Sequence, residues 1–251
     1  MDGVFHVSGE PIAGGAAAVA RLRDAGHRLR FVTNNTTRPR TDLAADLRAL
    51  GIALDDEELQ TTPRAAARAL EGKRVLALTM AAIVPDLEGV ELVGEDAEAV
   101  LLGGADETDE TGRVFSYTNL ARAFHELEGG AELYCLHKNR WWQTGLGPML
   151  DAGAFVAGLE YAAEVDATVL GKPSHAYFAA ALEALDADAE MTWMVGDDID
   201  VDITGAQQHG MKTVLVRTGK FRPDAVEAGR VRPDAILSSI AQLPEWLEEQ
   251  R

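Results

Sequence analysis

The stretch Met194-Val-Gly-Asp-Asp-Ile-Asp-Val-Asp202 decides the fold, because it joins a short apolar run, Thr192 to Val195, to an acidic turn. The apolar run predicts a buried strand. Carboxylates this close repel one another, so the turn exposes them to water, keeps a proton on one of them, or gathers them around a cation. Only the last arrangement, carboxylates around a cation, implies a catalytic or metal-binding role. The four acidic residues are Asp197, Asp198, Asp200 and Asp202.

Two plainer interpretations of the acidic turn compete with a catalytic one. The chain has 41 acidic residues in 251, so the turn could be a solvated strand-to-helix connection. It could also be an EF-hand calcium loop. If Asp200 opened that loop, Asp202 and Gly205 would fit its third and sixth positions, but Met211 stands where a bidentate Glu is needed. Spacing excludes the calcium loop and leaves the solvated turn open.

Composition indicates a globular protein with few classes of macromolecular partner. A chain of 251 residues with 47% hydrophobic residues can bury a sizeable core. The formal net charge of -18 argues against nucleic acid and anionic membrane as partners, because both would repel the protein. No apolar stretch approaches the roughly twenty residues that span a bilayer, and no signal peptide is recognised. We expect a cytoplasmic protein, and leave a homodimer open.

Cysteine and histidine point to no separate chemistry. The single cysteine, Cys135, lies in the apolar run Ala131 to Leu136 and is expected to be a buried small hydrophobe rather than a nucleophile. The six histidines are scattered, and none is paired at zinc-ligand spacing.

The two ends of the chain share a strand–helix rhythm that predicts an α/β fold with a parallel sheet. Apolar periodicity, capping residues and glycine stops mark the helices. The expected helices are Gly14 to Ala25, Thr41 to Leu50 with Thr41 as its cap, Pro63 to Leu70, His175 to Leu185, one ending at Gln208, and Ala241 to Glu249. Besides the strand before the acidic turn, the expected strands are Leu29 to Val32, one beginning at Thr168, Thr213 to Val216, and Ala235 to Leu237.

In the middle of the chain, from Arg74, short candidate strands are separated by turns, and this pattern predicts an inserted α/β subdomain. We therefore assign residues 1–72 and 168–251 to a core domain and 73–167 to the insertion. The acidic stretch Gly103 to Gly112 is expected to be a loop or hairpin. The expected strands are Val75 to Thr79, Ala99 to Leu102 and Glu132 to Leu136, and the expected helices are Tyr117 to Leu127 and Pro148 to Glu164.

Three polar motifs follow predicted parallel strands of the core: Thr33-Asn34, Lys172 and Asp197. In open α/β sheets, ligands bind outside the carboxyl ends of the strands. Taken singly, Thr33 and Asn34 could be a helix cap, and Lys172 could be a solvated surface lysine. Together with Asp2-Gly3, they predict one ligand site.

This ordered set resembles the haloacid dehalogenase superfamily of phosphotransferases, over nearly the whole chain. The resemblance implies a Rossmann-like core with an inserted C2-type cap, here the 73–167 insertion. The four family motifs are an Asp-x-Asp-Gly-Thr/Val turn, a Ser or Thr at a strand end, a Lys, and Gly-Asp-x-x-x-x-Asp. They correspond to Asp2-Gly3-Val4, Thr33-Asn34-Asn35, Lys172, and Gly196-Asp197 with Asp202.

Five further segments narrow the resemblance. Those that resemble the subclass IIA phosphatases with a C2-type cap are Val32-Thr-Asn-Asn35, Gly171-Lys-Pro-Ser174 and Val216-Arg-Thr-Gly-Lys-Phe221. Those that resemble the phospholysine phosphohistidine inorganic pyrophosphate phosphatase group are His137-Lys-Asn-Arg140 and Gly196-Asp-Asp-Ile199.

One departure from the family concerns the first motif. Its first aspartate, the family's nucleophile, would precede Met1, as would the apolar strand that carries it. We expect the native polypeptide to begin upstream, because a missing central strand would leave unpaired backbone groups at two apolar edges. An open frame that encodes an apolar run ending in Asp would confirm this expectation, and a stop codon directly before Met1 would contradict it.

The resemblance implies roles for the motif residues in a phosphatase acting on small phosphorylated substrates. Asp2 would be the general acid and base, and its carbonyl would join Asp197 as a ligand of Mg²⁺. Asp198 would be a reserve ligand, and Asp202 would orient Lys172 or a metal-bound water. The phosphate-binding groups would be Thr33 and Asn34 at a helix N-terminus, together with Lys172.

The insertion would select the substrate, and Lys138, Trp141 and Trp142 there could face it or only pack the subdomain. Two other functions stay open. Carbon–halogen hydrolysis would not need the metal-binding acids. A non-catalytic phosphometabolite-binding or regulatory module would follow if Met1 were the native start.

Overall fold

The computed structural model describes residues 1–7, 9–144, 147–227 and 231–250. The chain forms two compact units. The first unit comprises Met1–Thr33, Thr41–Gln60 and Lys172–Arg251, and the second comprises Asn34–Arg40 and Thr61–Gly171.

Residues 34–40, 61–72 and 168–171, which were expected in the core, fall in the second unit. Among them is helix α3 (Thr62–Ala69). Its residue Ala66 and the following Leu70 are fully buried in a cluster with Val75 and Leu101 of the second unit. Apolar burial against these strands therefore draws α3 into the second unit.

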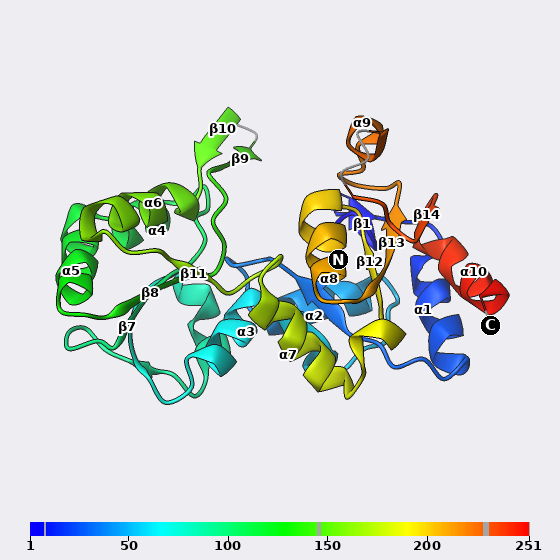
Figure 1. Ribbon diagram of the computed structural model, residues 1–251, viewed down its shortest axis with the longest axis horizontal. Coiled ribbons are helices and arrows are strands. Elements are labelled where there is room, and N and C mark those ends of the chain that lie inside the picture. Colours follow the sequence, from blue (N-terminus) through cyan, green and yellow to red (C-terminus); the bar gives the residue numbers. More distant parts are fainter. Residues whose placement is uncertain (8, 145–146, 228–230, 251) are drawn as a thin grey trace. The chain divides into compact units, whose positions relative to one another are not determined.

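The first unit alternates strands and helices along the chain (Figure 1). Its strands are β1 (His6–Val7), β2 (Glu10–Pro11), β3 (Phe31–Thr33), β4 (Leu59–Thr61), β12 (Trp193–Gly196), β13 (Lys212–Val216) and β14 (Ala235–Leu237). Its α-helices are α1 (Gly15–Asp24), α2 (Arg40–Ala49), α7 (His175–Leu185), α8 (Gly205–Gln208), α9 (Pro223–Glu227) and α10 (Leu243–Glu249). Short helical turns are η1 (Asp56–Glu58), η3 (Ala189–Met191), η4 (Ile199–Thr204) and η5 (Ile240–Gln242).

Strand β13 explains the layering of the first unit. It pairs in parallel with β12 on one side and with β14 on the other. Because side chains alternate along a strand, Val214 and Val216 pack with Ala18 of α1, while Leu215 packs on the opposite face with Ile203 of η4. Helical segments therefore cover both faces of this parallel sheet, as expected for an α/β fold.

The second unit is built on a five-stranded sheet in the order β11-β8-β7-β5-β6, in which neighbouring strands pair in parallel. The sheet strands are β5 (Arg74–Leu78), β6 (Glu91–Leu92), β7 (Ala99–Leu102), β8 (Glu132–Cys135) and β11 (Thr168–Val169). Strands β9 (Trp141–Thr144) and β10 (Gly147–Leu150) form a separate antiparallel pair. Besides α3, the helical segments are η2 (Ala81–Leu87), α4 (Asp109–Val114), α5 (Tyr117–Glu128) and α6 (Ala152–Ala163).

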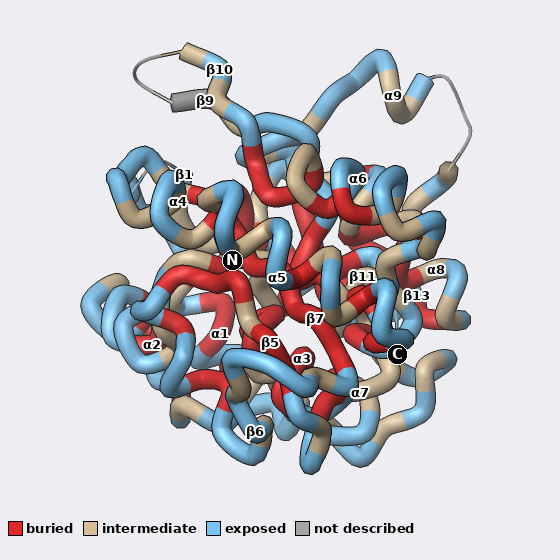
Figure 2. The backbone as a smooth tube through the Cα atoms, turned by 90° about the vertical axis from the view of Figure 1, so that its left-hand side faces the viewer, coloured by how far each residue is buried: buried red, intermediate tan, exposed pale blue. Residues whose placement is uncertain are grey.

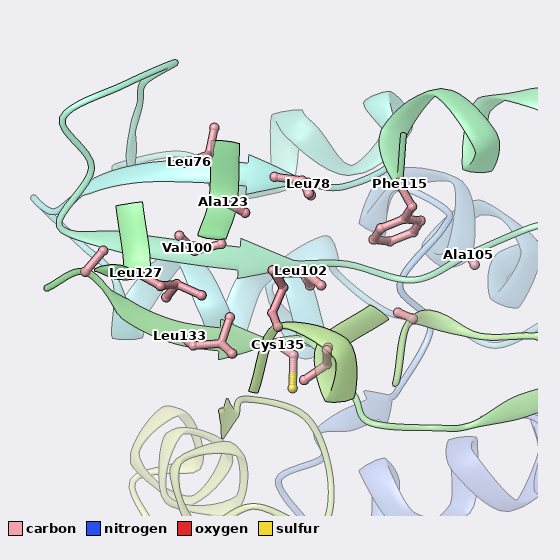
Figure 3. Packing of buried hydrophobic residues seen from close by; sticks show 14 residues of the cluster. Leu76, Leu78, Val100, Leu102, Ala105, Phe115, Ala123, Leu127, Leu133 and Cys135 are labelled. Carbon is pink, nitrogen blue, oxygen red and sulfur yellow. The ribbon is translucent and has the colours of Figure 1, made fainter. Parts of the chain in front are cut away.

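Strand β7 is fully buried, and Figure 2 shows its backbone as buried along its length. Its residues Val100 and Leu102 pack with Ala123 and Leu127 of α5, which lie close to them in Figure 3. The alternate residue Leu101 packs on the other face with the α3 cluster. The second unit is therefore also an α/β sandwich with a parallel sheet.

Most expected helices and strands are confirmed, some to the residue. Strand β7, helix α7 and strand β14 have the expected bounds. Elements α5, β8 and β13 differ from expectation by one residue at one end, and α1, α3, β5 and β12 by one residue at each end. These elements lie where apolar periodicity and stop signals agree.

Three expectations about element starts were wrong, and capping explains each. Within the expected loop 103–112, Thr108 accepts a hydrogen bond from Glu110 N (3.2 Å) and starts α4. The expected helix 148–164 begins only after Asp151, whose carboxylate accepts from Ala152 N (2.7 Å), and the residues before it form β10. Helix α2 begins at Arg40, whose N–H donates to Asp86 (2.7 Å), so Thr41 is not its cap.

No helix in the described residues is long and apolar enough to cross a membrane.

Candidate active site

The four acidic residues after β12 have four different environments. Asp197 and Asp202 are buried, with 6% and 5% of their surface exposed. Asp198 caps η4, because its Oδ1 accepts the N–H groups of Asp200 (3.0 Å) and Val201 (3.1 Å). Asp200 is exposed and pairs with Arg222 (2.8 Å). A simple solvated turn therefore describes Asp200 but not Asp197 or Asp202.

Asp202 forms a buried ion pair with Lys172. Lys172 Nζ lies 2.7 Å from Asp202 Oδ1, and both side chains are more than nine-tenths buried. Burial by itself would raise the pKa of Asp202, but the charge and hydrogen bond of Lys172 outweigh it, so the pKa is lowered. The interpretation of Lys172 as a solvated surface lysine was therefore wrong.

The two carboxylate oxygens of Asp197 differ in their hydrogen bonding. Its Oδ2 accepts the Lys220 N–H at 2.7 Å, and its Oδ1 receives no hydrogen bond from the described part of the chain. Gly3 packs so closely that a Cβ there would overlap the Asp197 carboxylate. Burial raises the pKa of Asp197, the Lys220 N–H lowers it, and Asp202 raises it again, with a net rise. The charge on Asp197 is thus incompletely compensated.

The first motif reaches the same place through Gly3 and the main chain of Met1. The Met1 amino nitrogen is buried; burial, and then the charge of Lys172, lower its pKa to about 6, while Asp202 and Asp197 oppose the shift. The Asp2 side chain is 71% exposed and lies 3.6 Å from His6 Nδ1. The structure therefore brings Gly3, Lys172, Asp197 and Asp202 together around the start of the chain, with Asp2 at their margin.

Thr33 and Asn34 belong to different units. Tyr177 holds the main chain of Thr33 at the end of β3, because its hydroxyl accepts from Thr33 N (3.0 Å) and donates to Thr33 O (2.9 Å). Burial raises the pKa of Tyr177, and the nearby charge of Asp202 adds to the rise. Asn34 Oδ1 accepts from Thr62 Oγ1 (3.4 Å) in the second unit.

The expected helix N-terminus at Thr33 and Asn34 is wrong. Helix α2 starts only at Arg40, because Asn35 Oδ1 first accepts the N–H groups of Thr37 (3.2 Å) and Arg38 (2.9 Å) and folds the intervening residues into a turn. Any phosphate contact by Thr33 and Asn34 would therefore come from the end of β3 and the turn that follows it.

The motif His137 to Arg140 lies in the second unit, and its first two members have structural partners there. Lys138 pairs with Glu160 at 2.6 Å. His137 is buried, with Nε2 at 3.1 Å from Thr36 Oγ1 and 3.5 Å from Asp151 Oδ1. Trp141 is exposed and lies on β9, which the sequence analysis did not predict as a strand.

The donor set around Asp197 fits magnesium better than a metal that needs many protein ligands. Among the residues that the structure describes, no group of three or more His, Cys, Asp or Glu side chains could hold a metal ion. Mg²⁺ is commonly held by one or two carboxylates, with water and substrate phosphate completing its shell. One buried carboxylate with an unshared oxygen meets that need.

Sequence reasoning missed several groups that shape this site. The Lys220 N–H is a main-chain donor and has no residue-type signal, although the segment Val216 to Phe221 had been singled out by resemblance. Tyr177 lies inside a helix, where its apolar ring gave no reason to expect a hydroxyl at β3. The His6 contact with Asp2 depends on a turn that brings residues four apart together.

Comparison with known proteins places the chain in a family. A model of haloacid dehalogenase-like hydrolases matches residues 1–93, and a HAD-hydrolase-like model matches residues 169–243. The phospholysine phosphohistidine inorganic pyrophosphate phosphatase of Xenopus laevis is 39% identical over 232 residues, which cover 89% of this chain and 83% of the relative.

Solved structures give the same result. A p-nitrophenyl phosphatase from Archaeoglobus fulgidus superposes with a TM-score of 0.87 at 27% identity, covering 98% of this chain and 96% of the other. A glycerol phosphate phosphatase from Mycobacterium tuberculosis, solved in complex with magnesium, gives a TM-score of 0.82 at 29% identity, covering 97% of this chain and 74% of the other. The α/β fold predicted from the sequence is confirmed, and the chain belongs to the haloacid dehalogenase-like hydrolases.

Proposed function

We propose that the protein is a magnesium-dependent phosphatase that hydrolyses small phosphorylated molecules through an aspartyl-phosphate. The observation that carries the proposal is the meeting of a buried lysine, Lys172, with an undercompensated carboxylate, Asp197, beside the first motif. The pair suits a phosphate dianion, which needs nearby positive charge and a cation held by a carboxylate. The names of the relatives and the magnesium in one solved neighbour support the same chemistry.

The nucleophile would be a carboxylate on a residue that precedes Met1. The main-chain nitrogen of Met1 is buried within the influence of Lys172, Asp202 and Asp197, so a residue joined there would enter the site. A carboxylate at that position would attack phosphorus and form an acyl phosphate, which replaces one difficult displacement by two easier ones.

Asp2 would move the proton in both half-reactions. Its exposed side chain could protonate the departing oxygen of the substrate in the first step. In the second step it would take a proton from the water that attacks the acyl phosphate, which releases inorganic phosphate and restores the carboxylate.

Lys172, Asp197 and Asp202 would supply the fixed charges. Lys172, held by Asp202, would offset the phosphate charge, while Asp197 and the Asp2 carbonyl would hold Mg²⁺, with Asp198 in reserve. Bound Mg²⁺ would lower the repulsion between the phosphoryl group and the surrounding carboxylates. The Thr33 hydroxyl, at the end of β3, and the Asn34 N–H, in the turn that follows, would bind phosphoryl oxygens.

The second unit would act as the C2-type cap and decide which phosphorylated compound is used. Its hairpin residues Trp141 and Trp142 offer aromatic surface, and Lys138 is drawn toward Glu160 rather than being free for substrate. We therefore expect the tryptophans to affect the Michaelis constant more than Lys138 does.

A phosphatase panel on the full-length protein, with and without Mg²⁺, tests this function. We expect release of inorganic phosphate that depends on Mg²⁺ and stops with EDTA. Trapping of a phosphorylated protein at an acid-stable or reducible aspartyl group would support the intermediate. Phosphate binding without turnover on any substrate would contradict the proposal and favour a binding module.

A further inference from the structure

The loop after β13, residues Thr218 to Lys220, contacts the acidic turn and the first motif at once. Lys220 N donates to Asp197 Oδ2 at 2.7 Å, and Thr218 Oγ1 donates to the Gly3 carbonyl. Three segments distant in the sequence are therefore tied together by bonds that do not involve the side chain of Lys220.

Gly219 allows this loop to pack directly against Asp197 and Gly3. Its φ is +62°, in the left-handed region that favours glycine. A Cβ on Gly219 would overlap the Asp197 carboxylate and lie 2.5 Å from the Gly3 Cα. Asp197 Oδ2 is thus packed against two glycines and accepts one main-chain N–H.

We propose that Thr218 and Gly219 are positioning residues for Asp197. They hold the Lys220 N–H on Oδ2, so that Oδ1 is the oxygen offered to the divalent cation. The inference rests on the proposed function, because it states how the carboxylate of that site is held.

The physical reason is the strict geometry that magnesium requires. Mg²⁺ needs near-ideal octahedral coordination, so a carboxylate that rotates freely is a poor ligand for it. A partner on the second oxygen stops the rotation, as outer-shell hydrogen bonds do for other metal ligands. Thr218 adds a second restraint, because it fixes the carbonyl of Gly3, the residue next to Asp2.

The test is Mg²⁺ binding measured by isothermal titration on the full-length protein, with Gly219→Ala beside a matched control. Gly26→Ala is the control, because Gly26 has φ +81° and a Cβ there would meet nothing within 4 Å. Both changes carry the backbone strain of a positive φ, but only Gly219→Ala pushes on Asp197. We expect Gly219→Ala to weaken Mg²⁺ binding about ten- to a hundredfold, and Gly26→Ala to leave it within about twofold of wild type.

A second pair keeps the inference testable if Gly219→Ala fails to fold. Thr218→Val removes the hydroxyl that binds Gly3 at nearly constant shape, and Thr218→Ser keeps it. We expect Thr218→Val to weaken Mg²⁺ binding severalfold and Thr218→Ser to restore it.

The outcomes separate this inference from the function on which it rests. If wild type binds Mg²⁺ and both Gly219→Ala and Thr218→Val bind it equally well, the positioning role is overturned while the proposed function stands. If wild type binds no Mg²⁺, the proposed function fails and takes the positioning role with it.

Discussion

Two buried aspartates, one in each unit, show what distinguishes a structural carboxylate from a candidate catalytic one. Asp151 in the second unit and Asp197 in the first are about equally buried, at 5% and 6% exposed. Asp151 Oδ1 accepts from Ala152 N (2.7 Å) and Ala105 N (3.4 Å) and lies 3.5 Å from His137. Within the described residues, Asp197 accepts one main-chain N–H, on Oδ2.

The difference between Asp151 and Asp197 shows that burial alone does not identify a candidate catalytic carboxylate. Asp151 has the partners that a buried charge needs, and it also caps α6, so its role in the fold is complete. Asp197 lacks such compensation, and burial raises its pKa. A carboxylate that stays short of partners in the folded state is one that a cation would stabilise.

Among the substitutions that test this comparison, Asp197→Asn should have the largest effect, on phosphatase turnover. In the full-length protein we expect it to reduce Mg²⁺-dependent phosphatase turnover by more than about a thousandfold, because even outer-shell partners of a metal ligand are worth ten- to a hundredfold. Asp151→Asn is the matched control, and its turnover should stay within about fivefold of wild type. Equal losses in the two variants, measured by phosphate release at saturating Mg²⁺, would contradict the distinction.

Lys172→Met should have the next largest effect, on stability. It leaves Asp202 charged and buried without its partner, which we expect to lower the free energy of unfolding by about 3 kcal/mol at pH 7. Lys172→Met combined with Asp202→Leu should recover part of that loss. Urea unfolding followed by circular dichroism measures both variants, and a double variant no more stable than the single one would count against the buried pair.

The Lys172–Asp202 pair predicts that the stability of wild type and of Lys172→Met depends on pH in opposite directions. The folded pKa of Asp202 is lowered by Lys172, so its contribution to stability is present above the unfolded value of about 3.9 and is lost as pH falls through the folded pKa. Without Lys172, burial would raise the pKa, and acidification from about pH 6 should then stabilise the variant relative to wild type. A parallel decline of both proteins between these pH values would refute the assignment.

Asp151→Ala should have a smaller effect, confined to stability. It removes the cap of α6 and leaves the N–H groups of Ala105 and Ala152 without their acceptor, so we expect a loss of about 2 kcal/mol. Mg²⁺ affinity should not change. Thermal unfolding and titration calorimetry on one sample give both values, and a weakened Mg²⁺ affinity would show that Asp151 is more than structural.

The smallest expected signal is the reaction of Cys135 with a thiol reagent. Cys135 is the last residue of β8, fully buried in a cluster with Val100 and Leu102 (Figure 3), and burial raises the pKa of its thiol to about 12. We expect no reaction with a thiol reagent at pH 8 in the native protein and complete reaction in denaturant. Rapid labelling of the native protein would mean that the second unit opens far more readily than its packing indicates.

The fold could be predicted well where apolar periodicity and stop signals coincide. Strand β7 and helix α7 have their expected bounds because β7 is a single apolar run that ends at Gly103, and α7 lies between the cap residues Ser174 and Asp186. The starts of α4 and α6 could not be placed, because Thr108 and Asp151 each resemble loop residues until their hydrogen bonds are seen. A cap is a local bond, and residue type alone does not reveal whether it forms.

The candidate site could be predicted only as a set of acidic and basic residues. The sequence pointed to Lys172, Asp197 and Asp202, and the structure shows a contact between Lys172 and Asp202, which was one of the two alternatives left open for Asp202. The sequence could not reveal that the Lys220 main chain and Gly219 contact Asp197. Residue type does not show where a main-chain N–H donates or how closely a glycine packs against a neighbour. The roles of all the proposed site residues stay predictions: Asp2, Thr33, Asn34, Lys172, Asp197, Asp198 and Asp202.

The most direct measurement of the central claim is Mg²⁺ binding to the full-length wild type, Asp197→Asn and Asp151→Asn by titration calorimetry. We predict that wild type and Asp151→Asn bind one Mg²⁺ with similar affinity, and that Asp197→Asn binds it at least about a hundredfold more weakly. Equal binding by all three proteins would contradict the claim that Asp197 is the carboxylate kept for the metal.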